Sequence, residues 1–251
     1  MTTAVVLTGR PGGTTARAVE VLAGLPPELR LIGGLAVLCR VGVPHRATVD
    51  LDALARDRDR YDVAVRSVAV SSTGGGQYVM AGRMELDVID VSPESAAALL
   101  DQLAGAGPLS DLELNAVAHT WAHDTATAMD VAVTSEESHE VLARATGRLV
   151  ASPAGLVAMK ATTVPLRASS RPEKRASDLY DLGRLVATAG GLAGLAEAPD
   201  LLRREVGRRL DDWFVQPRGR DRTFRDVRRF DEAALDLDEV ADIVTEAGLG
   251  A

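Results

Sequence analysis

The sequence predicts an α/β (α+β) protein in which a mixed sheet with flanking helices is followed by a helical C-terminal part. Of the 251 residues, 46% are hydrophobic and 25% are charged, which is typical of a globular protein. Strand-like and helical patterns alternate up to about residue 150, whereas only helical spacing follows. We therefore expect two domains, residues 1–150 and residues 151–251.

The first elements surround a pair of glycines. A helix is expected over residues 14–25, because threonines suit its N-cap and Pro26 begins a proline pair that stops it. A short apolar run then leads through Gly33 and its neighbour into a second helix, "LAVLCRVGV", which Pro44 ends. The segment "ATVDLD", residues 47–52, alternates like a strand.

Three more strands and a helix complete the predicted first domain. Residues 63–72 and 77–91 are strand-like, and the three glycines between them indicate a hairpin turn. Residues 92–107 predict a helix with Ser92 as its N-cap. The segment "TATAMDVAVTS", residues 125–135, is a further strand candidate.

The predicted second domain is helical. Residues 152–164, 171–190 and 236–248 all carry the spacing of amphipathic helices. We therefore expect a sheet-containing domain followed by a helical one.

The bulk properties exclude several classes of protein. The first residues lack a secretory signal, and no apolar run approaches the roughly 20 residues that span a bilayer. A single cysteine, Cys39, excludes an internal disulfide framework, so we expect a cytoplasmic protein. The net charge of −8 argues against nucleic-acid binding by the whole surface.

One stretch of this acidic chain is locally basic, because it is rich in arginine. Between residues 200 and 230, ten arginines stand against six acidic residues. Such a tract suits either phosphate contacts or a solvated helix pair with internal ion pairs, and the sequence leaves both open. The arginines are Arg203, Arg204, Arg208, Arg209, Arg218, Arg220, Arg222, Arg225, Arg228 and Arg229.

Two aspartates at the end of the third element point to a metal. In a strand, Asp50 and Asp52 share one face about 7 Å apart, where their charges repel each other. A divalent cation such as Mg²⁺ removes that penalty, and it favours carboxylate oxygens together with substrate phosphates. The alternative is an edge strand with a solvated acidic face, which an isolated Asp-x-Asp pair would favour.

The glycines change that balance. Gly33 and Gly34 lie where a strand meets a helix, and there the backbone N–H groups can approach a phosphate closely. A phosphate site and paired carboxylates in one short segment indicate a nucleoside triphosphate substrate.

A third acid is expected on a neighbouring strand. Asp87 in "RMELDVIDV" is the first choice, because it lies between apolar neighbours. Asp90 and Asp130 remain alternatives, and Glu85 shares the face of Asp87 as a solvent-exposed neighbour.

These motifs resemble those of a known superfamily and, within it, one family. The pattern "GGLAV…RATVDLD" resembles the DNA polymerase β-like nucleotidyltransferases, which have a glycine junction, a helix and then Asp-x-Asp. Residues 149–186 resemble the second half of the AbiEii/AbiGii-type (MenT-like) toxin nucleotidyltransferases. The matching positions there are Lys160, Arg167, Lys174, Asp178 and Asp181-Leu182.

The resemblance implies a metal-dependent nucleotidyltransferase with Mg²⁺ held by Asp50, Asp52 and Asp87. The phosphates of the triphosphate would be bound by Gly33, Gly34, Arg46 and Lys160. Asp178 and Asp181 either orient Lys160 or an arginine, or they form structural pairs with Lys174 and Arg184.

The resemblance also implies a biological role. The product would be tRNA carrying a nucleotide at its 3′ end, with a pyrimidine triphosphate such as CTP preferred, and the protein would be a toxin that blocks translation. Its partner would be a cognate antitoxin, which would phosphorylate Thr48. The arginine tract is where we expect the tRNA backbone, with Arg208, Arg209 and Arg220 as test positions. A nucleotidyltransferase that modifies a small hydroxylated molecule, such as an antibiotic, is the alternative.

Overall fold

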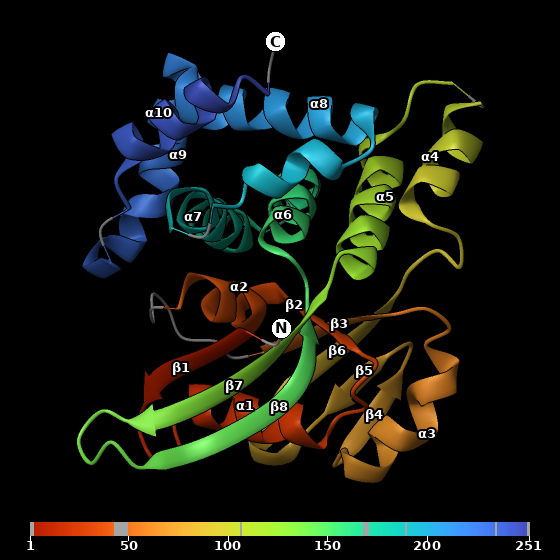
Figure 1. The fold of residues 1–251 in the computed structure, drawn as a ribbon, viewed down its shortest axis with the longest axis vertical. Coiled ribbons are helices and arrows are strands. Elements are labelled where there is room, and N and C mark those ends of the chain that lie inside the picture. Colours follow the sequence, from red (N-terminus) through yellow and green to blue (C-terminus); the bar gives the residue numbers. More distant parts are fainter. Residues whose placement is uncertain are drawn as a thin grey trace. The chain divides into compact units, whose positions relative to one another are not determined.

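The computed structural model describes residues 3–42, 50–105, 107–167, 171–188, 190–233 and 235–249 (Figure 1). The chain divides into two compact units, and each consists of two segments. The first unit contains Met1–Pro93 and Thr125–Ala151, and the second contains Glu94–Asp124 and Ser152–Ala251. The fold class predicted from the sequence is confirmed, since a mixed sheet with flanking helices is joined to a helical part.

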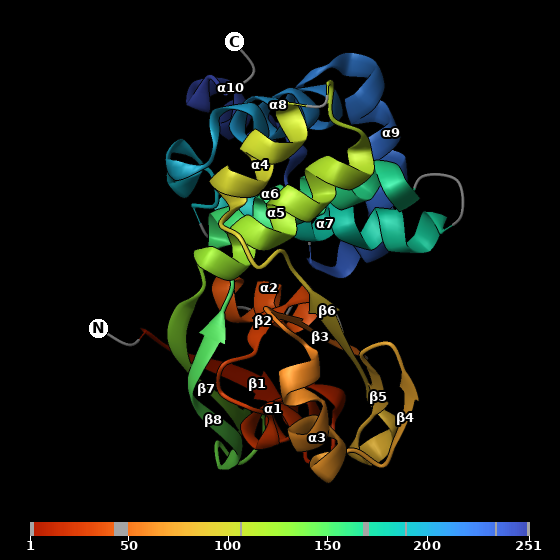
Figure 2. The same cartoon turned by 90° about the vertical axis from the view of Figure 1, so that its right-hand side faces the viewer.

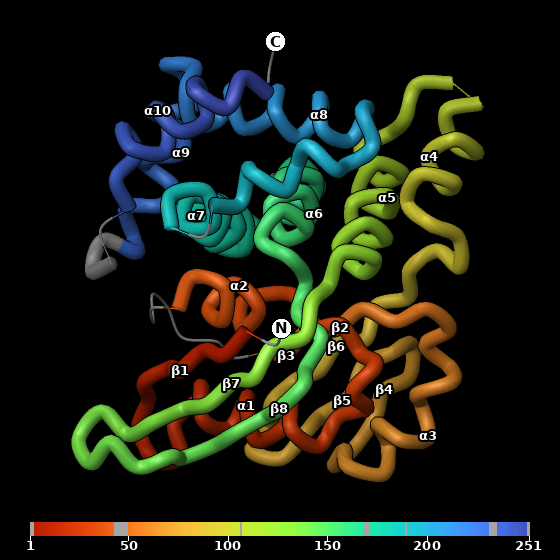
Figure 3. The backbone as a smooth tube through the Cα atoms, viewed as in Figure 1, coloured from red at the N-terminus to blue at the C-terminus, as the bar shows by residue number. Residues whose placement is uncertain are grey.

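A mixed sheet forms the first unit. In the described part of the chain it has eight strands in the order β1-β7-β8-β2-β3-β6-β5-β4. The strands are β1 (Thr3–Gly9), β2 (Arg30–Ile32), β3 (Asp50–Ala55), β4 (Ser71–Gly74), β5 (Gln77–Val79), β6 (Glu85–Asp90), β7 (Thr127–Ser135) and β8 (Val141–Val150). Figure 3 shows β7 and β8 as a long hairpin with β1 beside β7, and Figure 2 shows β4 and β5 beyond β6.

Strand β2 lies in the middle of the sheet and joins β1, β7 and β8 on one side to β3, β6, β5 and β4 on the other. Strand β2 pairs parallel to β8 and antiparallel to β3, and β3 pairs parallel to β6. The alternate residues Leu51, Ala53 and Ala55 of β3 are buried. The opposite face of β3 therefore carries Asp50 and Asp52.

In the described part of the first unit, three helices and a short turn accompany the sheet. They are α1 (Thr14–Gly24), α2 (Gly33–Val41), α3 (Asp59–Val68) and the 3₁₀ turn η1 (Ala81–Arg83). Arg40 of α2 donates to the carbonyl oxygens of Val150 and Ala151 at 2.7 and 2.8 Å and to the Thr127 hydroxyl at 2.7 Å. These bonds fix α2 against the ends of β7 and β8.

The second unit consists of helices. Its α-helices are α4 (Ala96–Ala104), α5 (Asp111–Asp124), α6 (Pro153–Arg167), α7 (Pro172–Thr188), α8 (Asp200–Leu210), α9 (Pro217–Val227) and α10 (Leu237–Ala247). The shorter turns are η2 (Ala193–Glu197), η3 (Asp211–Val215) and η4 (Arg228–Ala233). Helix α6 lies between α5 and α7 (Figure 1), and it is buried along most of its length.

The predicted strand at residues 63–72 is wrong for most of its length. Helix α3 occupies the segment up to Val68, and β4 begins at Ser71. The alternating valines resemble a strand, but only Val65 is buried, while Val63 is 79% exposed. Asp62 bonds Arg66 one turn later at 2.6 Å, and such local pairing favours the helix.

Two other boundaries also differ from the prediction. Residues 77–91 form two strands, β5 and β6, because Gly82 takes a φ of 70° in the turn between them. Helix α4 is capped by Ser95, whose hydroxyl accepts from the Ala98 N–H at 3.2 Å, and not by Ser92.

The two-part division also takes a different form. The first unit ends at Ala151, next to the expected boundary, but the segment Glu94–Asp124 belongs to the helical unit. Strands β1 and β8 were not expected from the sequence. In the described part of the chain, no helix is long and apolar enough to cross a membrane.

Candidate active site

The turn between β2 and α2 brings Gly33 against Asp52. Gly33 has a φ of +69°, and Ile32, just before it, is in register with Asp52 of β3. A Cβ atom at Gly33 would overlap the Asp52 carboxylate. Glycine is therefore required here both for its backbone conformation and for the close approach of the acid.

The same turn leaves the N-terminus of α2 open for an anion to bind. Ile32 provides no side-chain cap for α2, and the first turn of α2 contains no acidic residue. The N–H groups at a helix start have no partner within the helix, and they favour negative charge. The predicted phosphate position at Gly33 and Gly34 thus coincides with an uncapped helix N-terminus.

Four carboxylates form an array on β3 and β6. In this parallel pair Asp50 is in register with Glu85, and Asp52 with Asp87, so all four project from one face. The strands are about 4.8 Å apart, and successive residues on one face are about 7 Å apart. Asp50, Asp52 and Asp87 are half-buried, while Glu85 is exposed. Like charges at these spacings repel each other, and a cation would relieve that repulsion.

The structure separates the three candidates for the third acid. Asp87 lies beside Asp52 on the same face. Asp90 lies on the opposite face of β6, where it accepts from the Arg58 N–H at 2.9 Å. Asp130 is on β7, and it accepts from the Gly147 N–H at 2.7 Å. Asp90 and Asp130 therefore have local structural roles.

A polar residue that the sequence analysis did not single out borders the array. Gln77 of β5 is in register with Asp87, so it lies on the same face. Together with Thr73, Glu85 and Asp87, it lines a cavity of about 180 Å³. No sequence motif marks Gln77, because its position depends on antiparallel pairing of β5 with β6.

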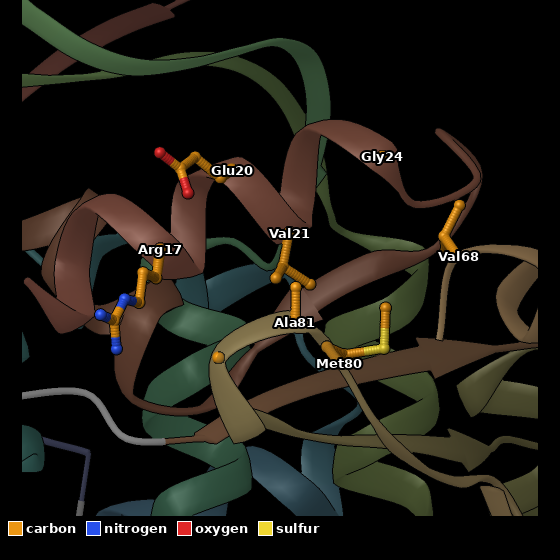
Figure 4. Close-up of a pocket in the computed structure, with 8 residues that line it drawn as sticks. Arg17, Glu20, Val21, Gly24, Val68, Met80 and Ala81 are labelled. Atoms are coloured by element: carbon orange, nitrogen blue, oxygen red, sulfur yellow. The ribbon is translucent and has the colours of Figure 1, made fainter. Parts of the chain in front are cut away.

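The larger cavity in Figure 4 is a different feature of the first unit. It has a volume of about 350 Å³, and Val21 of α1 points toward Met80 and Ala81 across it. None of the predicted site residues lines it.

In the second unit, α6 and α7 hold a buried ionic cluster. The Lys160 ammonium lies 2.8 Å from both Asp178 Oδ1 and Asp181 Oδ2, and all three residues are buried. The Arg167 guanidinium lies 3.0 Å from the second oxygen of Asp178. Asp178 and Asp181 are three residues apart on one helical face, so both reach the same ammonium. The structure thus pairs both aspartates with Lys160, the first of the two arrangements left open by the sequence.

Two of the predicted site residues cannot be placed, and the described residues contain no ready-made metal site. Arg46 and Thr48 lie outside the described residues. Within the described ranges, no group of three or more His, Cys, Asp or Glu side chains is close enough to hold a metal ion.

The three test positions in the arginine tract are engaged in ion pairs. Arg208 lies 2.9 Å from both Glu205 and Asp212. Arg209 is buried, 2.5 Å from Asp111, and it donates to the Ala161 carbonyl at 3.2 Å. Arg220 pairs with Asp238. Their selection as RNA contacts was therefore wrong for Arg209, which holds α8 against α5 and α6.

Comparison with known proteins identifies the family. The family described as "Nucleotidyl transferase AbiEii toxin, Type IV TA system" matches residues 17–246, which include both the carboxylate array and the ionic cluster. A comparison with curated proteins gives no match. Because the match covers nearly the whole chain, this protein belongs to the AbiEii nucleotidyl transferase toxin family of type IV toxin–antitoxin systems.

Proposed function

We propose that this nucleotidyl transferase moves a nucleoside monophosphate from a triphosphate, with a pyrimidine preferred, to the 3′ end of tRNA and so blocks translation. Family membership supports the transfer of a nucleotide and the toxin role. The observation that carries the proposal is the carboxylate array beside the Gly33 turn.

The array supports a magnesium-dependent reaction. Mg²⁺ is commonly held by one or two carboxylates together with substrate phosphates, so the Asp52–Asp87 pair, with Asp50 beside it, has suitable donors. When bound, the ion supplies positive charge for the triphosphate and activates the attacking hydroxyl. The N–H groups at Gly33 and Gly34 would bind a phosphate, and Asp52 would keep its place because Gly33 leaves room for it.

Lys160 is the proposed phosphate-binding cation of the second unit. Asp178 and Asp181 each contact the Lys160 ammonium at 2.8 Å, so they fix the position of this positive charge. We assign Asp178 and Asp181 the role of positioning Lys160, since their carboxylates contact it directly.

The test is transfer of label from each of the four nucleoside triphosphates to total tRNA, with Mg²⁺ or with EDTA. We expect labelling with a pyrimidine triphosphate, dependent on Mg²⁺, and a loss of at least a hundredfold in Asp52→Ala and Asp87→Asn. Asp90→Asn is the matched control, because Asp90 lies on the other face of β6.

Two results would contradict the proposal. Equal losses in Asp87→Asn and Asp90→Asn would remove the special role of the array. Turnover that ignores tRNA but responds to a small hydroxylated acceptor would favour the alternative substrate class.

Membership in a toxin–antitoxin family implies an antitoxin partner, and we propose Thr48 as the site that it modifies. Thr48 is two residues before Asp50, and a phosphate there would add nearly two negative charges next to the acidic segment. We expect loss of triphosphate binding after incubation with the antitoxin and ATP. Mass spectrometry that finds residue 48 unmodified would exclude this route.

A further inference from the structure

The outward side of α9 carries a regular row of arginines. Arg218, Arg222 and Arg225 follow one another at intervals of four and three residues, and Arg229 comes four residues later, just beyond the helix. This spacing places Arg218, Arg222 and Arg225 on one face of α9, and Arg229 follows at the start of the turn η4. Thr223 and Val227, on the opposite side of the helix, are buried. We call Arg218, Arg222, Arg225 and Arg229 the arginine stripe.

The stripe differs from the other arginines of the tract in its partners. Its four side chains are exposed, and in the described ranges none lies in an ion pair with a carboxylate. Arg225 and Arg229 each donate only to a backbone oxygen of the preceding turn, those of Asp221 and Asp226. The stripe therefore presents positive charge to solvent.

The acidic residues of α9 offset the stripe only in part. Asp226 pairs with Arg175 of α7, whereas Asp221 is exposed near Arg218 and Arg225, so one carboxylate stands against four guanidinium groups. In Figures 1 and 2, α9 lies at the rim of the helical unit. Like charges one turn apart destabilise a helix, so the stripe is not explained by the stability of α9.

Phe224 adds a second feature to the same helix. Its ring is 57% exposed, and it lines a cavity of about 490 Å³ with Val215, Pro217 and Arg220. Phe224 lies on a different side of α9 from the stripe, and Asp221, Asp236 and Asp238 also line its cavity, so this aromatic ring is not part of the basic surface. Guanidinium groups bind phosphates through paired N–H donors, so the stripe alone offers a series of phosphate contacts.

We propose that the arginine stripe binds the phosphate backbone of the RNA acceptor. The inference rests on the proposed function for the identity of that acceptor. The whole protein carries a charge of −8, so attraction to a polyanion must come from a local surface such as this one. RNA suits it better than an acidic protein surface, because evenly spaced backbone phosphates match arginines that follow one another at intervals of one helical turn.

The test is tRNA binding without any triphosphate, measured by fluorescence anisotropy at several salt concentrations. The stripe variant replaces Arg218, Arg222, Arg225 and Arg229 with Gln. The control variant replaces four exposed arginines of the first unit with Gln and so removes the same charge: Arg17, Arg60, Arg83 and Arg144. Thermal unfolding followed by circular dichroism checks that both variants are folded.

We expect the stripe variant to bind tRNA at least tenfold more weakly than wild type. The slope of log affinity against log salt concentration should become less negative by about 3, because four phosphate contacts are lost. The control should stay within about twofold of wild type. Equal affinities and slopes in wild type and the stripe variant would overturn the proposal, as would equal losses in both variants.

Nucleotide transfer by the wild type, measured with the same tRNA, separates this inference from the proposed function. Stripe-dependent binding without transfer would contradict only the proposed reaction. If nucleotide transfer occurs but tRNA binding does not depend on the stripe, only the role of the stripe in RNA binding is contradicted. The stripe would then be a surface for another polyanion, such as an acidic protein.

Discussion

Gly33 and Asp52 lie in contact because glycine has no side chain. In Gly33→Ala, the new methyl group would push the Asp52 carboxylate out of the array. We expect nucleotide transfer to fall about a hundredfold, since small displacements of reacting groups have effects of that size. Transfer kinetics and thermal unfolding measure the activity and the stability separately.

Gly42 offers a matched control for that substitution. It also has a positive φ, of 76°, but a Cβ there would meet no atom of the described residues within 4 Å. Gly33→Ala and Gly42→Ala should therefore share a strain of about 1–2 kcal/mol, while only the first loses activity. Similar activities in the two variants would show that backbone strain, and not the Asp52 contact, matters.

Cys39 illustrates a residue whose chemistry is suppressed by packing. Burial within α2 raises the pKa of its thiol to about 12. The pKa of the Cys39 thiol is higher in the folded chain than in the unfolded chain. Its burial as a neutral thiol therefore supports the fold fully below about pH 8.5, and this contribution to the free energy of unfolding is lost as the pH rises toward 12. We expect Cys39→Ala to lessen the fall in stability between pH 8.5 and 10, which denaturant titrations at each pH can measure. Rapid alkylation of the folded wild type at pH 8 would contradict this description.

At this scale the sequence predicted most of the proposed site. Alternation along the strands placed Asp50 with Asp52 and made Asp87 the first choice for the third acid. Helical spacing placed Asp178 and Asp181 on one face but left their partner open, and the structure pairs both with Lys160. The array itself, with Glu85 as its fourth member, depends on the register of β3 against β6. Register is a long-range property, so the sequence ranked Asp87 first but could not exclude Asp90 and Asp130.

Among the elements, α6 and α7 are joined by charges in a buried position. Asp181 is fully buried and contacts Lys160 at 2.8 Å. Asp181→Asn removes one of the two carboxylates that compensate the buried Lys160 ammonium and leaves Asp178 alone with it, so it should lower the free energy of unfolding by up to about 3 kcal/mol. Urea titration measures this loss.

An exposed pair provides the comparison. Asp200 and Arg203 lie 2.7 Å apart on α8, but the Asp200 side chain is 79% exposed. Asp200→Asn should cost less than about 1 kcal/mol, since solvent screens such pairs. If both variants lost the same stability, burial of the α6–α7 cluster would have no energetic importance.

The errors at this scale have local causes. The valines near residue 65 alternate as in a strand, but α3 buries only one of them. Strand β1 pairs in parallel with β7, more than a hundred residues away in sequence. Pairing partners at that distance leave no local signal, whereas α4, α6, α7 and α10 of the second unit were recognisable from their own spacing.

For the whole molecule, the segmented second unit has a consequence for truncation. Residues 152–251 alone lack α5, whose buried Val117 and Trp121 belong to the helical core. We expect this fragment to unfold without a cooperative transition in circular dichroism. A chain that joins residues 94–124 to 152–251 through a short linker should unfold cooperatively, and failure of both would show that the unit needs the sheet.

The parallel register of β3 and β6 also ties function to correct folding. A slip of one residue would replace Asp87 with Leu86 or Val88 beside Asp52 and turn the acids to opposite faces. If the array holds the metal as proposed, a chain with this slip would lack the acid pair altogether. A toxin of this fold would then gain its activity only after two strands more than thirty residues apart have found their native alignment.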